Sequence, residues 1–449
     1  MNKGSKKATP PVEERILQLF KHLGIQRAHI AGQMTADWKD FAAAHHEAIS
    51  SITIICPIGI DTGALSAIGS KTLVFSGNEG PRAENVQQGM TNLPEATLVT
   101  LKRCQNLPWA NVVADHRDEI YAAMMAFLSH IDQEQVGSFP PLREGDGEFA
   151  GLSYRISGHG TPIVLLPLGL APSQWEPIVA KLGEHYCTIT LGGAALGFVA
   201  VLEARGWSTG YLRIVRNLME EVDLQPGDSV LEVGCGTGVI SRWLARSTAG
   251  KNKIVGVDIS PYLLREAIAL TKSEGLGGLI DFREGNAEAL PIPDESFDIT
   301  VSYTVLEEGD ADKMLKEMIR VTKPGGRLAV IVRSVDMPSL VNVPIRAGLK
   351  SKIEAPGGGV AEKGCADIGL YQRLRRAGFY QVKMFPQMAT VDASNGPWWH
   401  FLQNQLLGKL TQEELNEWQA GMVKAESEET FFVSMPYHSA VGTKPPPAK

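Results

Sequence analysis

The sequence has few cysteines and no excess of positive charge. Its five cysteines are Cys56, Cys104, Cys187, Cys235 and Cys365. They are odd in number and scattered, so they lack the paired spacing typical of a zinc site or a disulfide framework. We therefore expect reduced thiols, no bound metal and a cytoplasmic location. The formal net charge is −7, which gives no electrostatic footprint for nucleic acid.

Long hydrophobic runs are also missing. No stretch is long and apolar enough to span a membrane, and no apolar segment follows the lysines at the amino terminus, so we expect neither a membrane span nor a secretory leader. The chain of 449 residues exceeds the size at which one hydrophobic core usually stops growing. We therefore expect two domains, residues 1–205 and 206–449.

The most informative segment is residues 230–238, which read Val-Leu-Glu-Val-Gly-Cys-Gly-Thr-Gly. An apolar run followed by three alternating glycines predicts a buried parallel strand that enters a tight turn before a helix. Glycines at such a turn let the backbone approach a ligand closely. A second apolar strand ends at Asp258, where a carboxylate can accept hydrogen bonds from both hydroxyls of a ribose.

The glycine spacing narrows the choice of nucleotide. A dinucleotide fingerprint needs Gly-x-Gly-x-x-Gly, and the third glycine is missing whether one starts at Gly234 or Gly236. The pattern Glu-x-Gly-x-Gly-x-Gly instead resembles the first motif of class I S-adenosylmethionine (SAM)-dependent methyltransferases. Further motifs of that family's small-molecule branch, which includes the quinone-biosynthesis enzymes, follow in family order across residues 206–445.

The resemblance implies SAM as the cofactor and a Rossmann-like, doubly wound α/β fold for residues 206–449. The residues that it implies for the cofactor site are Glu232, Gly234, Cys235, Gly236, Gly238, Asp258, Ile259, Asn286, Ala287, Ser302 and Tyr303. The glycine backbone would approach the methionyl part, Asp258 would bind the ribose, and Asn286 with Ala287 would meet the adenine. Tyr303 fits an ordinary packed aromatic residue equally well.

The residues that act on the acceptor are harder to identify from the sequence. By the resemblance the acceptor is a small molecule methylated on oxygen or carbon, and a general base would help if it carries an acidic hydroxyl. Relatives often have a histidine where this chain has Glu308, so Glu308 is one candidate base, although Glu307 and Glu308 also suit the first turn of a helix. His400, in a helical insertion over residues 392–428, is the other.

The amino-terminal half alternates helical and strand patterns, which predicts a second α/β domain. We expect helices at Val12–Leu23, at Trp38–Ile49 and at Asp115–Ile131. Strands are expected at 28–31, 71–75, 96–101 and 163–166.

Residues 12–138 resemble the carboxy-terminal half of an α/β-hydrolase, and residues 148–197 resemble its amino-terminal half, so the domain looks circularly permuted. Met34 stands where the nucleophile of Gly-x-Ser-x-Gly would be, and Ala36 replaces the last glycine. Asn106 occupies the place of the catalytic histidine. A thioether and an amide cannot replace nucleophile and base, so we expect no catalysis by a triad here.

The role of the amino-terminal domain is therefore expected to be structural. It would cover the substrate or form a homo-oligomer interface. Two alternatives remain open. The chain could be a SAM-binding scaffold or regulator without enzymatic activity, or a hydrolase that uses an unrecognised nucleophile such as Cys104 or a serine.

Overall fold

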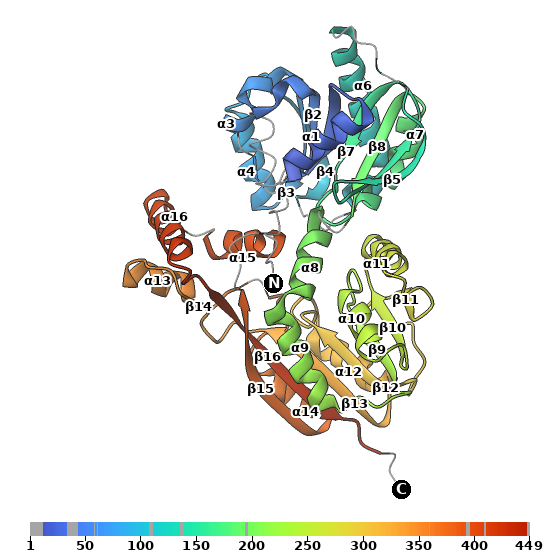
Figure 1. Ribbon diagram of the computed structural model, residues 1–449, viewed down its shortest axis with the longest axis vertical. Helices are drawn as coiled ribbons and strands as arrows, with labels where there is room; N and C mark the ends of the chain where they lie inside the picture. The colour runs from blue at the N-terminus through green and yellow to red at the C-terminus, as the bar shows by residue number, and fades with distance from the viewer. Residues whose placement is uncertain are drawn as a thin grey trace, which may run out of the picture. The chain divides into compact units, whose positions relative to one another are not determined.

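The computed structural model describes residues 12–33, 44–57, 59–60, 62–106, 111–134, 139, 141–193, 196–358, 360–391, 396–407 and 410–446. The chain divides into two compact units, Met1–Ala200 and Val201–Lys449, and each contains its own β-sheet with helices (Figure 1). The boundary lies inside helix α8 (Gly197–Trp207). The division expected from the sequence, after residue 205, falls in the same helix.

Unit 1 is built on an eight-stranded sheet with the order β4-β3-β2-β1-β7-β8-β6-β5. Its strands are β1 (Ala28–Gly32), β2 (Ile49–Ile55), β3 (Thr72–Glu79), β4 (Thr97–Gln105), β5 (Gly145–Phe149), β6 (Leu152–Ser157), β7 (Thr161–Leu165) and β8 (Tyr186–Gly192). Strand β6 runs antiparallel to β5 and β8, and all other neighbouring strands are parallel.

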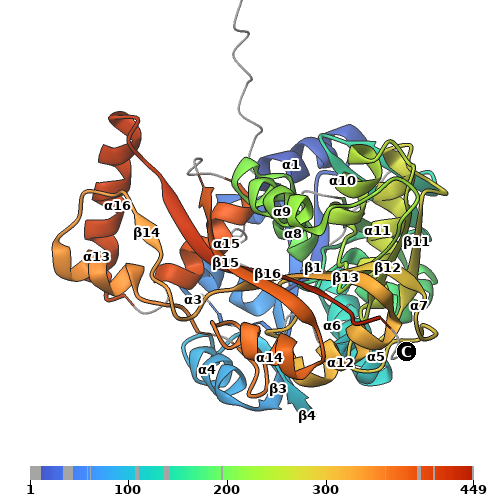
Figure 2. The same ribbon diagram turned by 90° about the horizontal axis from the view of Figure 1, so that it is seen from below.

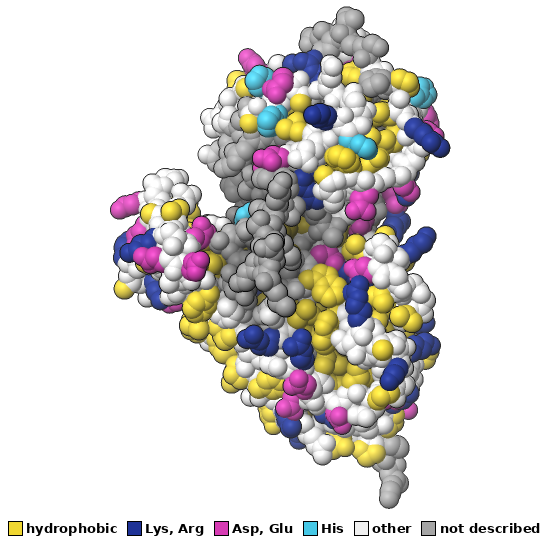
Figure 3. Space-filling model, viewed as in Figure 1, with side chains coloured by type: hydrophobic (Ala, Val, Ile, Leu, Met, Phe, Trp, Pro, Cys, Tyr) yellow, Lys and Arg dark blue, Asp and Glu magenta, His cyan; other side chains and the backbone are white. Residues whose placement is uncertain are grey.

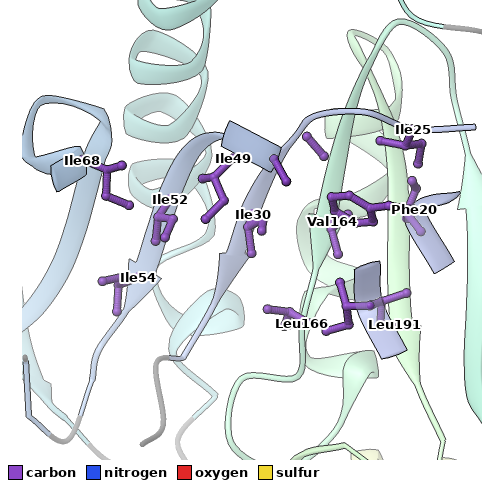
Figure 4. Packing of buried hydrophobic residues seen from close by; sticks show 14 of the residues in the cluster. Phe20, Ile25, Ile30, Ile49, Ile52, Ile54, Ile68, Val164, Leu166 and Leu191 are labelled. Atoms are coloured by element: carbon purple, nitrogen blue, oxygen red, sulfur yellow. The ribbon is translucent and has the colours of Figure 1, made fainter. Parts of the chain in front are cut away.

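Helices cover both faces of this sheet. The elements are α1 (Val12–Leu23), η1 (His46–Ala48), α3 (Thr62–Leu65), η2 (Ser66–Lys71), α4 (Pro81–Met90), α5 (Val112–Asp115), α6 (Arg117–Glu134), η3 (Pro172–Trp175) and α7 (Glu176–Gly183). Consecutive strand residues point to opposite faces, so Ile30 and Val164 pack in one core with α1, while Ala31 and Leu165 pack in the other with α6 and α7. Figure 4 shows the first of these two cores.

The sequence expectations for unit 1 hold in most places. Helix α1 has the predicted bounds, and strands occur at all four predicted positions. The helix expected at Trp38–Ile49 falls mostly outside the described residues. Ala44 is helical, but the short η1 follows at His46–Ala48, and Ile49 begins the central strand β2. Met34 and Ala36 lie outside the described residues.

Unit 2 is built on a sheet with the order β11-β10-β9-β12-β13-β16-β14, and β15 also pairs with β16. Its strands are β9 (Ser229–Val233), β10 (Lys253–Asp258), β11 (Ile280–Glu284), β12 (Phe297–Tyr303), β13 (Thr322–Arg333), β14 (Leu340–Val341), β15 (Tyr380–Val391) and β16 (Val433–Thr443). Strands β9 to β13 are parallel, and β16 is antiparallel to its neighbours. This is the doubly wound architecture predicted for residues 206–449.

The helices of unit 2 form two layers around the sheet. They are α9 (Thr209–Val222), α10 (Val239–Ser247), α11 (Pro261–Ser273), α12 (Ala311–Val321), α13 (Ala347–Glu354), α14 (Leu370–Arg376), α15 (Pro397–Leu407) and α16 (Gln412–Ser427). Helices α9 and α10 pack on one face, and α12 and α14 on the other, as Figure 2 shows. In the chain, helices α15 and α16 follow β15 and precede β16. Together with α13 they enclose a separate apolar cluster. None of the described helices has the length and apolar character needed to cross a membrane.

Helix α9 is held firmly against the sheet. The side chain of Ser208 accepts a hydrogen bond from the backbone N–H of Tyr211 and so caps the helix. Apolar residues at helical spacing, from Tyr211 to Val222, face the core. Gly210 allows close approach to β15, because an added Cβ would stand 2.2 Å from the carbonyl oxygen of Thr390. The helix therefore fixes the position of the Tyr211 side chain.

The strand order reverses at β9, since β10 and β11 follow on one side and β12 and β13 on the other. In open α/β sheets, ligands bind beyond the carboxyl ends of the strands at such a reversal. The segment that follows β9 is the predicted glycine turn.

Candidate functional site

The glycine turn has a backbone that other residues would strain. Gly234, Gly236 and Gly238 all have positive φ, at 74°, 54° and 71°. A Cβ on Gly234 would stand 2.3 Å from Cγ2 of Val305, and one on Gly238 would stand 2.5 Å from Cζ of Phe282. The turn is thus pressed against the segment after β12 and against β11, with no room for side chains at these positions.

Asp258, at the end of β10, shapes the turn. Its Oδ2 accepts from the backbone N–H of Gly236 at 2.7 Å, and its Oδ1 accepts from that of Ser260 at 2.9 Å. Burial raises the pKa of its carboxyl group. Each carboxylate oxygen has a second lone pair, so Asp258 can still accept two hydroxyl hydrogens. The next residue, Ile259, exposes 66 % of its surface and offers an apolar face beside the carboxylate.

Glu232 lies beneath the turn, on β9. Its carboxylate accepts from the hydroxyl of Ser241 on α10, and burial raises its pKa to about 8. Cys235 is also buried, which raises the pKa of its thiol. Ser302 donates its hydroxyl to the carbonyl of Val233 at 3.0 Å and so ties β12 to β9. The structure brings these predicted residues together at the carboxyl end of β9.

A buried ionic network supports the turn from below, and sequence reasoning missed it. Arg242 on α10 is fully buried and pairs with Glu203 on α8, with Glu274 at 3.0 Å and with the carbonyl of Thr237 at 2.5 Å. Glu203 also accepts from the hydroxyl of Thr237 at 2.5 Å. No local spacing could reveal this network, because Glu203 precedes the motif and lies on a different helix.

The predicted adenine-side residues lie in the turn after β11. The side-chain oxygen of Asn286 accepts from the backbone N–H of Glu288 at 2.8 Å, and Ala287 packs against the core of unit 2. The backbone N–H of Gly285 donates to the carbonyl of Asp258 at 2.9 Å. This bond holds the turn next to Asp258.

Tyr303 is a core residue in this structure. It is buried, and its hydroxyl donates to the sulfur of Met219 on α9 at 3.5 Å. Burial raises its pKa well above the ordinary value for tyrosine. The structure therefore describes Tyr303 as a packed aromatic residue, and its contact with a cofactor stays a prediction.

The two glutamates after β12, Glu307 and Glu308, differ in solvent exposure. Neither begins a helix, because they lie in a turn and α12 starts only at Ala311, capped by Asp310. The Glu308 side chain is 64 % exposed and pairs with Arg333 at 3.1 Å. Glu307 is fully buried, its Oε1 accepts from the backbone N–H of Arg333 at 2.6 Å, and burial raises its pKa to about 7. Its other oxygen, Oε2, has no hydrogen-bond partner.

His400, the other candidate base, lies on an exposed face of α15, while its neighbours Trp398 and Trp399 are buried. The guanidinium of Arg205 lies 5.8 Å from the centre of the Trp398 ring and 5.0 Å from that of Tyr211. Arg205 Nε and the Tyr211 hydroxyl are buried without a hydrogen-bond partner. The roles of Glu308 and His400 in catalysis remain predictions.

In unit 1 the corresponding sheet edge is closed by hydrogen bonds. Asn106 is buried after β4, its Oδ1 accepts from the N–H of Gly77 at 2.7 Å, and its Nδ2 donates to the carbonyl of Pro57 at 2.9 Å. Two thiols, those of Cys56 and Cys104, lie 4.0 Å apart at the same edge.

A serine, a histidine and an aspartate also meet in unit 1. His29 Nδ1 lies 2.7 Å from the Ser51 hydroxyl, and His29 Nε2 lies 3.1 Å from Asp132. Both Ser51 and His29 are fully buried inside strands, and the serine hydroxyl and both imidazole nitrogens are already engaged with one another and with Asp132. Across the described residues of both units, no three His, Cys, Asp or Glu side chains are grouped to hold a metal ion.

Comparisons with known proteins point to unit 2. A family model described as a methyltransferase domain matches residues 231–330. Methyltransferase GfsG of Streptomyces halstedii is 40 % identical over 119 residues, which are 26 % of this chain and 42 % of that protein. Ubiquinone/menaquinone biosynthesis C-methyltransferase UbiE of Cronobacter sakazakii is 32 % identical over 168 residues, 37 % of this chain and 64 % of that protein. The chain thus covers less than two thirds of the length of these two relatives.

The UbiE protein of Hahella chejuensis is matched over more of its length. It is 36 % identical over 179 residues, 40 % of this chain and 69 % of that protein. Among solved structures, the [4+2]-cyclase SpnF is 24 % identical, with 54 % of this chain and 85 % of that chain covered and a TM-score of 0.34. A SAM-dependent methyltransferase of Methanosarcina mazei is 19 % identical, with 52 % and 97 % covered and a TM-score of 0.32.

These structural scores are low, so the assignment rests on the sequence relatives and the matched domain. The identity to the Hahella chejuensis protein extends over more than two thirds of that protein. The chain therefore belongs to the class I SAM-dependent methyltransferase family, whose cofactor is S-adenosylmethionine.

Proposed function

We propose that unit 2 transfers a methyl group from SAM to an oxygen or carbon atom of a small-molecule acceptor. The observation that carries this proposal is the glycine turn at the strand-order reversal, with Asp258 fixing its backbone at 2.7 Å. The turn leaves an open backbone surface beside a carboxylate that can accept two hydroxyl hydrogens. A cofactor with a ribose fits this arrangement.

The roles proposed for the remaining residues follow from their positions. Asp258 would hold the ribose, Ile259 would cover one face of the adenine, and Asn286 with Ala287 would meet the adenine edge. The oxygen of Asn286 accepts from the backbone N–H of Glu288, so its NH₂ group and the second lone pair of its oxygen are left for a ligand. Glu232 would orient the turn and the ammonium end of the cofactor.

Methyl transfer from SAM does not require the protein to supply a nucleophile. When bound, SAM supplies an activated methyl group on a positively charged sulfur. The protein residues hold the acceptor in line with that methyl group and exclude water. Orientation of this kind can lower a barrier by roughly 7–11 kcal/mol. This is why the cofactor residues are recognisable in the sequence and the acceptor residues are not.

The relatives suggest which acceptors to test first. The printed name of the UbiE relatives specifies a C-methyltransferase of ubiquinone and menaquinone biosynthesis. Benzenediols with an electron-rich ring carbon are therefore the first candidates for this chain. On the face drawn in Figure 3, acidic and basic side chains are interspersed over the described surface of unit 2, which suits a neutral small molecule.

We also propose that unit 1 is a circularly permuted α/β-hydrolase-like domain without hydrolytic activity. Its strand order supports this: read from β5, the sheet becomes 1-2-4-3-5-6-7-8 with only the second strand antiparallel, which is the order of an α/β-hydrolase sheet. Asn106 and the fully buried Ser51 support the absence of catalysis. The domain would cover the substrate or form a homo-oligomer interface.

Label transfer tests the main proposal. Full-length protein is incubated with methyl-labelled SAM and a panel of benzenediols, phenols and 1,3-diketones. We expect label in at least one acceptor and no hydrolysis of short p-nitrophenyl esters. Tight SAM binding without label in any acceptor would favour a SAM-binding scaffold. Ester turnover that survives loss of SAM binding would favour a hydrolase.

A further inference from the structure

Three of the six buried polar side-chain atoms that lack a hydrogen-bond partner in the described part of unit 2 belong to residues of one region. They are Oε2 of Glu307, the hydroxyl of Tyr211 and Nε of Arg205. The Arg205 guanidinium lies over the Tyr211 ring at 5.0 Å. Burial raises the pKa of Tyr211, and Arg205 and the Thr304 side chain oppose this rise. The Tyr211 ring lies 5.8 Å from the ring of Tyr437, which pairs across the sheet with Arg333. Because Arg333 donates its backbone N–H to Glu307, these groups belong to one region of unit 2. A folded protein rarely leaves such atoms unpaired, because each costs about 1–3 kcal/mol.

These atoms lie beside the predicted methyl end of the cofactor site. Glu307 is two residues after Val305, whose side chain packs against Gly234 of the glycine turn. Tyr211 packs in the same apolar cluster as Val239, the residue that follows the last glycine of that turn. The unpaired atoms are therefore at the carboxyl end of β12, next to the strand-order reversal, where an acceptor must stand to meet the methyl group.

Charged and titratable groups from several elements surround Glu307. Arg333 on β13 donates its backbone N–H to Oε1 of Glu307, and its side-chain Nε lies 3.5 Å from the same oxygen. Burial raises the pKa of Glu307 to about 7, and the charge of Glu308 in the same turn adds to this rise. Burial also raises the pKa of Tyr437 on β16 and of Cys365, and the charge of Glu307 adds to both. Arg205 on α8 opposes the rise in Tyr211 and Tyr437. The only nearby cations in this set are the two arginines.

We propose that Glu307 is the general base of the methyl transfer, with Tyr211 and Arg205 binding the acceptor oxygen, and that the acceptor carries a weakly acidic hydroxyl, either a phenol or an enol. This inference rests on the proposed function and deepens it. A carboxylate with one free, desolvated oxygen accepts a proton from such a hydroxyl. A tyrosine hydroxyl and a guanidinium N–H then donate to the oxygen as negative charge develops on it.

The step balances as follows. The acceptor O–H bond breaks and its proton passes to Oε2 of Glu307. The resulting oxyanion, or the ring or α-carbon conjugated with it, forms a bond to the methyl carbon. The bond between that carbon and sulfur breaks, and its electron pair remains on sulfur, giving the neutral thioether product. After carbon attack, loss of the carbon-bound proton to water restores the phenol or enol.

A Glu307→Gln variant distinguishes a purely structural role of Glu307 from its role as general base. Its Oε1 anchors the end of β13 by accepting from the Arg333 N–H. A glutamine at this position keeps an acceptor oxygen for that bond and has nearly the same shape, but it cannot take a proton. Glu307→Gln should therefore preserve folding and remove only proton transfer. Glu426→Gln, at an exposed glutamate on α16, serves as a matched control.

The experiment uses 4-nitrophenol as the probe, because its ionised form is yellow. Full-length protein saturated with S-adenosylhomocysteine is titrated with the probe at a pH at which most free probe is protonated. We expect the wild type and Glu426→Gln to bind it mainly ionised, with an ionised fraction about tenfold above that of free probe. In Glu307→Gln this enrichment should vanish. With the best acceptor of the panel, Glu307→Gln should also lower kcat by about 10²–10⁴-fold and remove the rise of kcat/KM with pH.

Two results would overturn the inference. One is wild-type protein that leaves 4-nitrophenol unbound or bound without ionisation. The other is a Glu307→Gln variant with wild-type ionisation and an unchanged pH profile. Calorimetric binding of SAM separates this failure from failure of the proposed function. If SAM binds the wild type and Glu307→Gln equally, only the role of Glu307 is lost. If SAM does not bind the wild type at all, the proposed function itself fails.

Discussion

The two units differ in the hydrogen bonding of buried polar groups at the carboxyl edge of their sheets. In unit 1, Asn106 satisfies the backbone groups of Gly77 and Pro57, and the edge is closed by neutral hydrogen bonds. In unit 2, the edge holds Glu307 with an unpaired buried oxygen, beside Tyr211 and Arg205 with unpaired atoms of their own. Both units are α/β sheets, but at this edge the buried polar groups of Asn106 have hydrogen-bond partners, and one carboxylate oxygen of Glu307 has none.

The difference indicates where ligands bind. Unpaired buried groups lower stability, so a sequence retains them where a ligand completes their hydrogen bonds. Buried hydroxyls without a partner also occur elsewhere, in Thr53 and Ser173 of unit 1 and in Thr271 of unit 2, so a missing partner alone does not mark a site. An unpaired carboxylate oxygen next to the cofactor turn is a stronger sign of function. The four predictions below test this contrast, starting with the largest effect.

Removing Arg242 should have the largest effect. Arg242→Met leaves the buried carboxylate of Glu203 without its cation, which typically lowers the free energy of unfolding by about 3–5 kcal/mol. Hydrogen exchange measured by mass spectrometry should show the loss in α8 and α10, with peptides of unit 1 unchanged. The double variant with Glu203→Gln should recover part of the loss. Equal protection in α10 of the wild type and Arg242→Met would contradict the ionic support of the turn.

A side chain at Gly234 should disrupt cofactor binding next. Gly234→Val places a β-branched residue at positive φ, within 2.3 Å of Val305, and the strain is about 1–3 kcal/mol. We expect SAM affinity to fall at least tenfold in calorimetry. Gly227→Val, at a position with similar φ but open space around it, is the matched control and should bind SAM normally. Normal SAM binding by Gly234→Val would mean that the cofactor does not need this backbone.

Breaking the closed edge of unit 1 should affect stability alone. Asn106→Ala leaves the N–H of Gly77 and the carbonyl of Pro57 unpaired, and each buried unpaired group costs about 1–3 kcal/mol. We expect a lower thermal midpoint for unit 1 with unchanged SAM affinity and methyl transfer. A fall in methyl-transfer rate at constant SAM affinity would instead show that unit 1 takes part in the reaction, and the contrast between the units would have to be redrawn.

The last effect is a pH dependence of stability in cofactor-free protein. Burial raises the pKa of Glu232 from 4.5 to about 8 and that of Glu307 from 4.5 to about 7. Between these values the native protein keeps protons that the unfolded chain has released, so the free energy of unfolding falls as pH rises. The slope is at most about 1.4 kcal/mol per pH unit for each group. Urea unfolding in steps from about pH 5 to 8 should show it, and Glu232→Gln should flatten it. A stability that rises over this range would contradict the buried, uncharged state of these groups.

The sequence predicted the strands and the glycine turn that carry the proposed cofactor residues, because that information is local. The glycines, Glu232 and Asp258 lie within about one strand-turn-helix-strand unit, where spacing translates directly into position. The acceptor side is not local. Arg205, Tyr211 and Glu307 come from α8, from α9 and from the turn after β12, and only the packed sheet brings them together.

The errors of prediction have physical causes as well. Strand β2 was not predicted, although Ile49, Ile52 and Thr53 are β-branched residues that favour strands. Glu308 was chosen over Glu307 by comparison of motifs. The structure exposes the side chain of Glu308 and buries that of Glu307, and burial decides which carboxylate can hold a proton near neutral pH.

Calorimetric titration of the full-length protein with SAM, and separately with NAD, tests the central claim most directly. The wild type should bind SAM and not NAD, and Asp258→Ala should lose about 10–100-fold in SAM affinity, because each hydrogen bond to a charged group contributes about 1.5–3 kcal/mol. Tight NAD binding, or SAM binding that is unchanged in Asp258→Ala, would contradict the assignment of this turn to the methyl donor.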